Sequence, residues 1–257
     1  MVSLKNKIVF ITGATSGIGK SCAVEFARSG ANLILCARRG DLLNNFAEEL
    51  IAQFGIKIYS FQLDVRNEDD VNNAVASFPD QWKNVDVLIN NAGLARGLAK
   101  LHEDDTANWN EMIDTNVKGL LYVTRAIVPG MVERNNGHII NIGSIAGHEA
   151  YPKGGAYCAT KHAVNAITKS LRMDLVDTNI RVSTIDPGLV ETNFSVIRFH
   201  GDHDRAKGVY KGLEPLTGTD IAETAVFIAT RPAHITLAEV VIFPTSQASA
   251  TVVHREN

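Results

Sequence analysis

The segment Thr12-Gly13-Ala14-Thr15-Ser16-Gly17-Ile18-Gly19 directly follows the apolar run KIVFIT at 7–12 and opens a segment of helical period at 17–30. Glycine permits a tight turn and lets the backbone approach a ligand closely. The free N–H groups and the positive dipole at the start of a helix favour a pyrophosphate. The segment therefore predicts a dinucleotide-binding loop between the first strand and the first helix. A glycine-rich turn without a ligand is the alternative when this short motif is considered alone.

Short β-rich runs alternate with longer segments of helical period along almost the whole chain. This alternation is typical of βαβ units, which build a parallel sheet with helices on both faces. No linker rich in Pro, Gly or Ser divides the 257 residues, so we expect one doubly wound α/β domain over 1–257. The further expected strands are 32–37, 57–63, 86–90, 138–142, 181–185 and 239–243, and the further helices are 40–55, 67–78, 106–133, 156–177 and 219–230.

Single residues mark several helix ends. Gly30 and Gly55 stand where a left-handed residue would end a helix, and Asn67 and Thr106 stand where N-caps belong. The stretch 190–216 is charged and has little strand character. Long inserts of this kind usually form lids or binding loops, so we expect a substrate lid there.

Composition excludes several classes of protein. Apolar residues make up 45% and charged residues 21%, which are ordinary values for a soluble enzyme, and no segment reads as a signal peptide or membrane span. The three cysteines, Cys22, Cys36 and Cys158, are scattered, so we expect reduced thiols and no metal site. A net charge of −3 gives no reason to expect nucleic acid as a partner. We expect a cytoplasmic protein that does not bind membranes.

Two arginines follow the second strand, where an NAD-binding protein would carry Asp or Glu on the ribose 2′-hydroxyl. Arg38 and Arg39 stand at the start of a helix, where the dipole opposes their charge. A bound 2′-phosphate would stabilise two guanidinium groups at this position. The sequence therefore favours NADP over NAD, with a pair of solvated surface arginines as the alternative.

Polar residues also follow the third and fourth strands. Asp64-Val65 and Asn91-Ala92-Gly93 both fall at carboxyl ends, where open parallel sheets bind ligands. For either segment taken alone, the alternative interpretation is an ordinary N-cap or an Asx-rich turn without a ligand.

A possible acid/base group lies further along the chain. Tyr157 and Lys161 are four residues apart and share one helix face, and Ser144 follows the fifth strand. The Lys161 ammonium and the positive nicotinamide of a cofactor would favour the Tyr157 phenolate, while Ser144 holds the substrate oxygen. An exposed amphipathic helix is the alternative for this spacing alone. Asn116 lies inside the long predicted helix, where asparagine is a poor helix former. We expect it to have a hydrogen-bond partner, to cap a bend or to face solvent.

TGATSGIG, NNAG, Asn116, Ser144, YCATK and Pro187-Gly188-x-x-x-Thr192 together resemble the short-chain dehydrogenase/reductase superfamily over nearly the whole chain. The resemblance implies a Rossmann-type fold and a catalytic tetrad of Asn116, Ser144, Tyr157 and Lys161. It also implies that Lys161 binds the nicotinamide ribose, that Asn116 supports a proton-relay water and that Pro187-Gly188 contacts the nicotinamide. Ser183 departs from the Asn that many members carry. The expected cofactor site comprises Gly13, Thr15, Ser16, Gly17, Ile18, Gly19, Arg38, Arg39, Asp64, Val65, Asn91, Ala92, Gly93, Tyr157, Lys161, Pro187, Gly188, Val190 and Thr192.

A narrower resemblance covers 111–147, 187–202 and 242–249. These segments are similar to the NADP-dependent 3-hydroxy acid dehydrogenases that oxidise serine and L-allo-threonine and reduce malonic semialdehyde. This branch implies a homotetramer and small substrates such as serine, L-allo-threonine, 3-hydroxypropionate or 3-hydroxyisobutyrate. Ser144, Tyr157 and Arg198 are the expected substrate contacts.

Arg198 in the expected lid and Lys153 before Tyr157 agree with an acidic substrate, since arginine pairs well with a carboxylate. A solvated Arg198, or one that reaches the cofactor phosphates, is equally compatible with the sequence. Two other functions stay open: a carbonyl reductase for neutral ketones or aldehydes, and an NADP-sensing protein without turnover.

Overall fold

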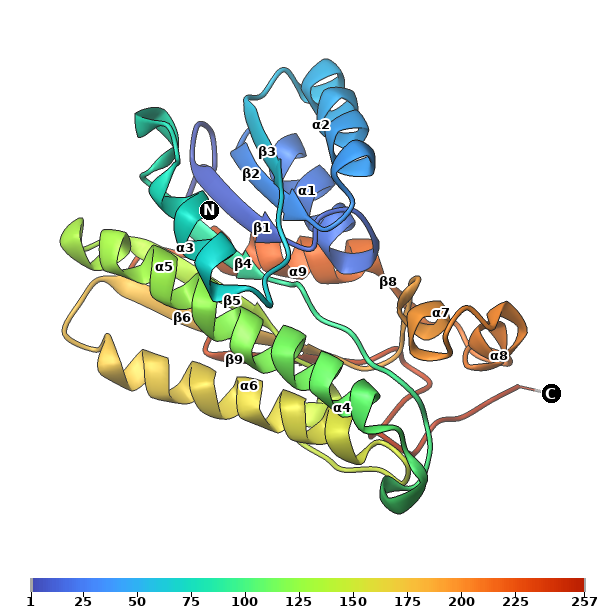
Figure 1. The fold of residues 1–257 in the computed structure, drawn as a ribbon. Helices are drawn as coiled ribbons and strands as arrows, with labels where there is room; N and C mark the ends of the chain where they lie inside the picture. The colour runs from blue at the N-terminus through green and yellow to red at the C-terminus, as the bar shows by residue number, and fades with distance from the viewer. Residues whose placement is uncertain (1, 257) are drawn as a thin grey trace.

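The seven β-rich runs form one parallel sheet with the strand order β3-β2-β1-β4-β5-β6-β9 (Figure 1). The computed structural model describes residues 2–256. A Rossmann-type, doubly wound sheet in a single domain is therefore confirmed. The strands are β1 (Ile8–Thr12), β2 (Asn32–Ala37), β3 (Ile58–Gln62), β4 (Val87–Asn90), β5 (Gly137–Ile142), β6 (Ile180–Pro187) and β9 (Glu239–Ile242).

Helices cover both faces of the sheet because successive strand residues point to opposite sides. In β1, Val9 and Ile11 join the apolar core under α1, α2 and α9, whereas Phe10 joins the core under α3 and α5. The longer helices are α1 (Gly17–Arg28), α2 (Gly40–Phe54), α3 (Glu68–Ala76), α4 (Thr106–Ile113), α5 (Leu120–Glu133), α6 (Gly155–Asp174) and α9 (Gly218–Ala229). Short 3-10 turns lie at Asp80–Trp82, Leu101–Glu103 and Ile145–Gly147.

The chain changes direction in the sheet at β1. From β1 it builds β2 and β3 on one side and then crosses to β4 on the other, which leaves a crevice at the carboxyl ends of β1 and β4. Thr12 Oγ1 accepts hydrogen bonds from the N–H groups of Asn91 (3.0 Å) and Ala92 (2.9 Å). Asn91 Nδ2 in turn donates to the carbonyl oxygens of Thr12 (2.9 Å) and Gly13 (3.2 Å). These contacts join the two sides of the crevice.

The long helix expected at 106–133 contains a π-helical turn, Asp114–Gly119, between α4 and α5. Its predicted N-cap, Thr106, is the first helical residue instead, because the Asp105 side chain accepts the Ala107 N–H. Asn67 caps α3 as predicted, and its side chain accepts from the N–H groups of Asp69 and Asp70. The left-handed residues are also confirmed, with φ +82° at Gly30 and +66° at Gly55.

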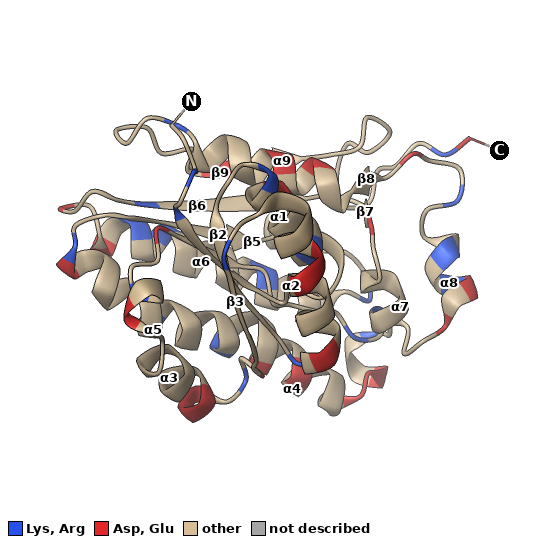
Figure 2. Ribbon diagram, turned by 90° about the horizontal axis from the view of Figure 1, so that it is seen from above, with Lys and Arg blue, Asp and Glu red and all other residues tan. Residues whose placement is uncertain are grey.

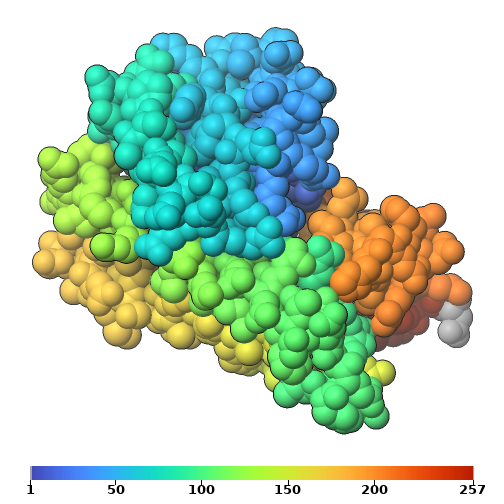
Figure 3. Space-filling model, in the orientation of Figure 1, coloured from blue at the N-terminus to red at the C-terminus, as the bar shows by residue number. Residues whose placement is uncertain are grey.

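The segment 190–216 stands beside the body of the molecule and is coloured orange in Figures 1 and 3. It contains β7 (Val190–Glu191), α7 (Phe194–Arg198) and α8 (His203–Gly208), and β7 pairs with β8 (Leu216–Thr217). Figure 2 shows charges of both signs on α8. The two helices are too short for hydrophobic periodicity to reveal them. Within residues 2–256, no helix combines the length and apolar character needed to cross a membrane.

Candidate active site

A cavity of about 830 Å³ opens at the carboxyl ends of the strands, between the glycine-rich loop and segment 190–216. It brings together most of the residues that the sequence singled out. The predicted residues that line it are Gly13, Thr15, Ser16, Gly17, Ile18, Arg38, Arg39, Asp64, Val65, Asn91, Ala92, Gly93, Ser144, Tyr157, Lys161, Pro187, Gly188, Val190, Thr192 and Arg198. Among the described residues, Gly19, Asn116 and Lys153 lie outside this lining.

The glycine-rich loop has the shape that a phosphate cradle needs. Gly13 and Gly17 have φ of +69° and +54°, in the left-handed region that favours glycine. A Cβ atom on Gly19 would collide with the side chain of Asn91 and the carbonyl of Gly13. The N-cap of α1, Ser16, makes no side-chain capping bond, so the N–H groups of the first turn stay available for an anion. The loop therefore fits a pyrophosphate.

The two arginines after β2 lie at the outer end of the cavity. Arg39 Nη2 donates to Thr15 Oγ1 (3.0 Å), which draws its guanidinium over the glycine-rich loop. Arg38 Nη1 lies 3.7 Å from Glu111 Oε1 and is about half exposed. Both guanidinium groups border the space beyond the phosphate cradle. This arrangement fits a 2′-phosphate.

Asp64 lines the same end but is already paired. Arg66 Nε donates to both Asp64 carboxylate oxygens, at 2.9 and 3.0 Å. The hydrogen bonds from Arg66 hold the pKa of Asp64 below its usual value. The sequence did not single out Arg66, which also lies 3.9 Å from Glu111.

Ser144 lies at the exit of β5, where it caps the turn Ile145–Gly147. Its Oγ accepts the Ala146 N–H (3.1 Å). Its own N–H donates to Asp186 Oδ1 (3.1 Å), a buried carboxylate in β6. The Ser144 hydroxyl is thus held at the cavity wall, beside Tyr157.

Tyr157 lies in the first turn of α6 with its side chain almost fully buried, and its ring meets Phe194 of α7 edge-on. Burial raises the pKa of Tyr157 above its usual value, and the neighbouring Tyr151 adds to this increase. The Ser144 hydroxyl and the Arg198 guanidinium act in the opposite direction. Activation of Tyr157 by the Lys161 ammonium and the positive nicotinamide ring stays a prediction.

Lys161 is one helical turn further along α6 and is also buried. Its Nζ donates to the Ile142 carbonyl (2.8 Å) at the end of β5. Burial lowers the pKa of Lys161 to about 8, while the charge of Asp186 acts against this decrease. The ammonium is thus anchored at the sheet edge near Tyr157, where ribose hydroxyls of a dinucleotide would need a donor.

Asn116 neither faces solvent nor lines the cavity. It lies in the π-helical turn, where its Oδ1 accepts the Leu94 N–H (2.8 Å). Its Nδ2 donates to the Leu94 carbonyl (2.8 Å) and to Thr160 Oγ1 (3.0 Å). The side chain therefore ties the turn to the segment after β4 and to α6, and its relation to a proton-relay water stays a prediction.

Arg198, at the end of α7, reaches the chemical end of the cavity rather than solvent. Its guanidinium carbon lies 5.6 Å from the ring centroids of both Tyr151 and Tyr157. Its Nη1 donates to the Tyr151 hydroxyl (3.1 Å) and its Nε to the Gly97 carbonyl (3.0 Å). Sequence reasoning missed Tyr151, whose one signal was its position just before Pro152 and the start of α6.

A second arginine fastens segment 190–216 to the body of the molecule. Arg96 holds Glu111 of α4 through Nε (2.6 Å) and Nη2 (3.1 Å), and its Nη1 donates to the Ile197 carbonyl in α7 (2.7 Å). The Gly97 N–H also donates to the Arg198 carbonyl (2.9 Å). We call these contacts, with the Arg198–Gly97 bond, the latch. No sequence motif marks Arg96.

Comparison with known protein families matches residues 7–201 to the family described as short chain dehydrogenase. The chain belongs to the short-chain dehydrogenase family.

Individual relatives extend the similarity to nearly the whole chain. The NADP-dependent 3-hydroxy acid dehydrogenase of Schizosaccharomyces pombe is 44% identical over 257 residues, which are 100% of this chain and 99% of that protein. Sulfoacetaldehyde reductase 2 of Chromohalobacter salexigens is 41% identical over 97% of this chain and 99% of its own length. The closed form of serine dehydrogenase complexed with NADP+ superposes with a TM-score of 0.90 at 44% identity, over 97% of this chain and 100% of that one.

Proposed function

We propose that this short-chain dehydrogenase transfers a hydride between NADP and a small 3-hydroxy acid or the matching semialdehyde. Serine, L-allo-threonine, 3-hydroxypropionate and 3-hydroxyisobutyrate are the candidate substrates. The observation that carries the proposal is the Arg198 guanidinium, which lies 5.6 Å from the Tyr157 ring centroid at the chemical end of the cavity. A cation at this distance from the acid/base group fits a substrate whose acid group is attached to the carbon next to the one that bears the hydroxyl.

The cofactor is NADP, and the residues at the outer end of the cavity suit it. The first-turn N–H groups of α1 would hold the pyrophosphate, and Arg38 and Arg39 would hold the 2′-phosphate by charge-assisted hydrogen bonds. NADP, when bound, accepts or supplies the hydride. Lys161 Nζ, anchored 2.8 Å from the Ile142 carbonyl, is suited to donate to the nicotinamide ribose.

Three side chains would handle the substrate oxygen and its proton. The Ser144 hydroxyl would donate a hydrogen bond to that oxygen and fix its position. Tyr157 would take the hydroxyl proton during oxidation and return it during reduction. Because burial raises the pKa of Tyr157, its proton leaves only when nearby positive charge favours the phenolate. Lys161, one helical turn further along α6, and Arg198, 5.6 Å from the Tyr157 ring centroid, are the candidate sources of that charge.

Arg198 would bind the substrate carboxylate. Its Nε and Nη1 are held by Gly97 and Tyr151, while its Nη2 donates no hydrogen bond within residues 2–256. An oriented guanidinium with a free donor suits one carboxylate oxygen. The named relatives act on a 3-hydroxy acid, on serine and on sulfoacetaldehyde, each of which is a small molecule with an acid group.

The test compares each hydroxy acid with a neutral analogue of the same length, by following the absorbance of reduced nicotinamide with NADP+ and with NAD+. We expect turnover of the acids with NADP+ and none in Tyr157→Phe. Arg198→Met should raise KM for the acids by about 10- to 100-fold more than KM for the neutral analogue, the value of one hydrogen bond to a charged group. The neutral analogue reports the loss of the Gly97 and Tyr151 contacts alone. Arg205→Met is the matched control, since Arg205 stacks on Phe199 in the same segment.

The outcomes separate the competing functions. Equal KM changes for acid and neutral substrates in Arg198→Met would show that Arg198 does not bind the substrate carboxylate. Turnover of neutral carbonyls alone would favour a general carbonyl reductase. NADP+ binding without turnover of any substrate would favour the NADP-sensing protein.

We also propose a homotetramer. Apolar side chains are exposed on two separate parts of the surface, namely Leu121 and Val132 on α5, and Phe227 and Val241 on α9 and β9. Two different self-complementary interfaces are what a tetramer with crossed two-fold axes needs.

A further inference from the structure

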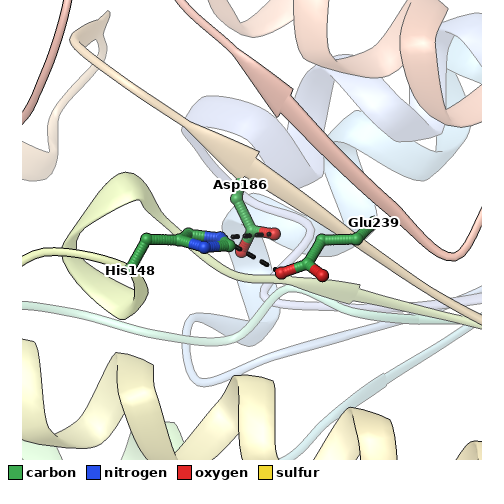
Figure 4. A group of neighbouring side chains, drawn as sticks. All are labelled: His148, Asp186 and Glu239. Atoms are coloured by element: carbon green, nitrogen blue, oxygen red, sulfur yellow. Dashed lines mark ion pairs between the residues drawn. The ribbon is translucent and has the colours of Figure 1, made fainter.

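Three possible metal ligands converge behind the Ser144 turn, outside the lining of the cavity (Figure 4). His148 follows the turn Ile145–Gly147, Asp186 lies in β6, and Glu239 opens the neighbouring strand β9. His148 Nε2 is 3.2 Å from Asp186 Oδ2 and 3.4 Å from Glu239 Oε1. One ligand atom of each residue therefore faces a common point.

Asp186 brings an unsatisfied oxygen to this point. Its side chain is completely buried, and its Oδ1 accepts from the Ser144 N–H and from Thr184 Oγ1, each at 3.1 Å. Its Oδ2 has no hydrogen-bond partner within residues 2–256. A buried carboxylate oxygen without a donor is costly, and Figure 4 shows the Asp186 carboxylate turned toward His148 and Glu239.

The contacts of His148 Nε2 favour a nitrogen that accepts rather than donates. Asn165 Nδ2 donates to the Gly147 carbonyl (3.2 Å), which fixes the orientation of the Asn165 amide because a carbonyl can only accept. The same Nδ2 lies 3.2 Å from His148 Nε2, so the ring nitrogen accepts there. In this tautomer three acceptor atoms meet, and either a proton or a cation is needed between them. A lysine, Lys169, lies beside the group, with its Nζ 3.7 Å from Glu239 Oε1.

We propose that His148, Asp186 and Glu239 form a binding site for a divalent transition metal ion, with zinc as the best match. Zinc binds both imidazole nitrogen and carboxylate oxygen, and the two negative charges here would balance the ion. Ligands about 2.0–2.1 Å from a tetrahedral zinc lie roughly 3.3–3.4 Å apart, close to the two separations measured from His148 Nε2. The Asp186 hydrogen bonds would orient that ligand. His148 and Glu239, with side chains 25% and 29% exposed, leave a path for the ion.

The experiment titrates the chelator-stripped full chain with Co²⁺, read by its visible absorption, and with Zn²⁺, read by calorimetry. We expect one saturable equivalent per chain with a tetrahedral Co²⁺ spectrum. His148→Gln and Glu239→Gln should abolish both signals, whereas His254→Gln, which removes an exposed imidazole elsewhere, should retain them. Lys169→Met should tighten binding about two- to fivefold, because it removes a competing surface charge.

Each result decides the proposal. No saturable equivalent in the wild-type chain, or equal binding in His148→Gln and Glu239→Gln, would overturn it. Binding is measured without substrate or cofactor, so its outcome does not depend on the proposed dehydrogenase activity.

Discussion

At the residue scale, burial acts in opposite directions on the pKa values of the two α6 residues at the centre of the site. It raises the pKa of Tyr157 and lowers the pKa of Lys161 to about 8, because a low dielectric disfavours the charged form of each group. Burial therefore favours the neutral form of both side chains, and only nearby charges can favour the phenolate of Tyr157. The proposed chemistry depends on that, since Tyr157 must exchange one proton in each direction.

The lowered pKa of Lys161 predicts a pH dependence of stability. Above pH about 8 the folded chain releases this proton, whereas the unfolded chain keeps it up to pH about 10.5, so the unfolded state binds more protons and stability rises with pH. The cost of burying the ammonium is fully present below pH 8. Between pH 7 and 9 the wild-type free energy of unfolding should rise by about 1 kcal/mol relative to Lys161→Met, measured by urea unfolding. A difference that does not change with pH would contradict this.

At the element scale, the π-helical turn between α4 and α5 is what allows Asn116 to reach the segment after β4. An uninterrupted α-helix would direct this side chain differently, because each residue of an α-helix turns through a larger angle than a residue of a π-helix. In the turn, Asn116 satisfies both backbone groups of the buried Leu94. A helix irregularity thus positions the strand-end segment that borders the cavity.

Asn116→Ala should therefore destabilise the chain by about 3 kcal/mol, since it leaves the N–H and carbonyl of Leu94 buried without partners. Urea unfolding measures the effect. Asn110→Ala on the exposed side of α4 is the control and should change stability by less than about 0.5 kcal/mol. Equal small effects of both substitutions would show that water replaces the Asn116 contacts.

At the scale of the whole molecule, two separate exposed apolar areas predict how the proposed tetramer would dissociate into dimers. Leu121→Asp on α5 and Phe227→Glu on α9 should each yield a dimer, because each charge disrupts one of two independent interfaces. The double variant should be a monomer. Light scattering after size exclusion gives the mass, and Leu42→Glu, an equally exposed apolar residue of α2, should leave the tetramer intact. A monomeric wild-type chain would exclude the assembly.

The parts of the molecule that the sequence predicts are those with local signals. The glycine-rich loop and the seven apolar runs carry their own conformational preferences, and the spacing of Tyr157 and Lys161 places them on one helix face. The π-helical turn has no such signal, because the hydrophobic pattern continues through 114–119. Arg96 and Tyr151 are recognisable only from contacts between distant segments, such as the Tyr151 hydroxyl bond to Arg198, 47 residues away.

The latch has a consequence for the timing of a catalytic cycle. Arg96, held by Glu111 of α4, donates to the Ile197 carbonyl, and Arg198 donates to the Gly97 carbonyl. The bonds to Ile197 and Gly97 must both break when segment 190–216 swings away. Hydrogen bonds to charged groups each contribute about 1.5–3 kcal/mol, so opening is a cooperative event with an appreciable barrier. Product release, rather than hydride transfer, would then limit the rate of turnover. A more viscous solvent would therefore lower kcat more than deuterium substitution at the reacting carbon would.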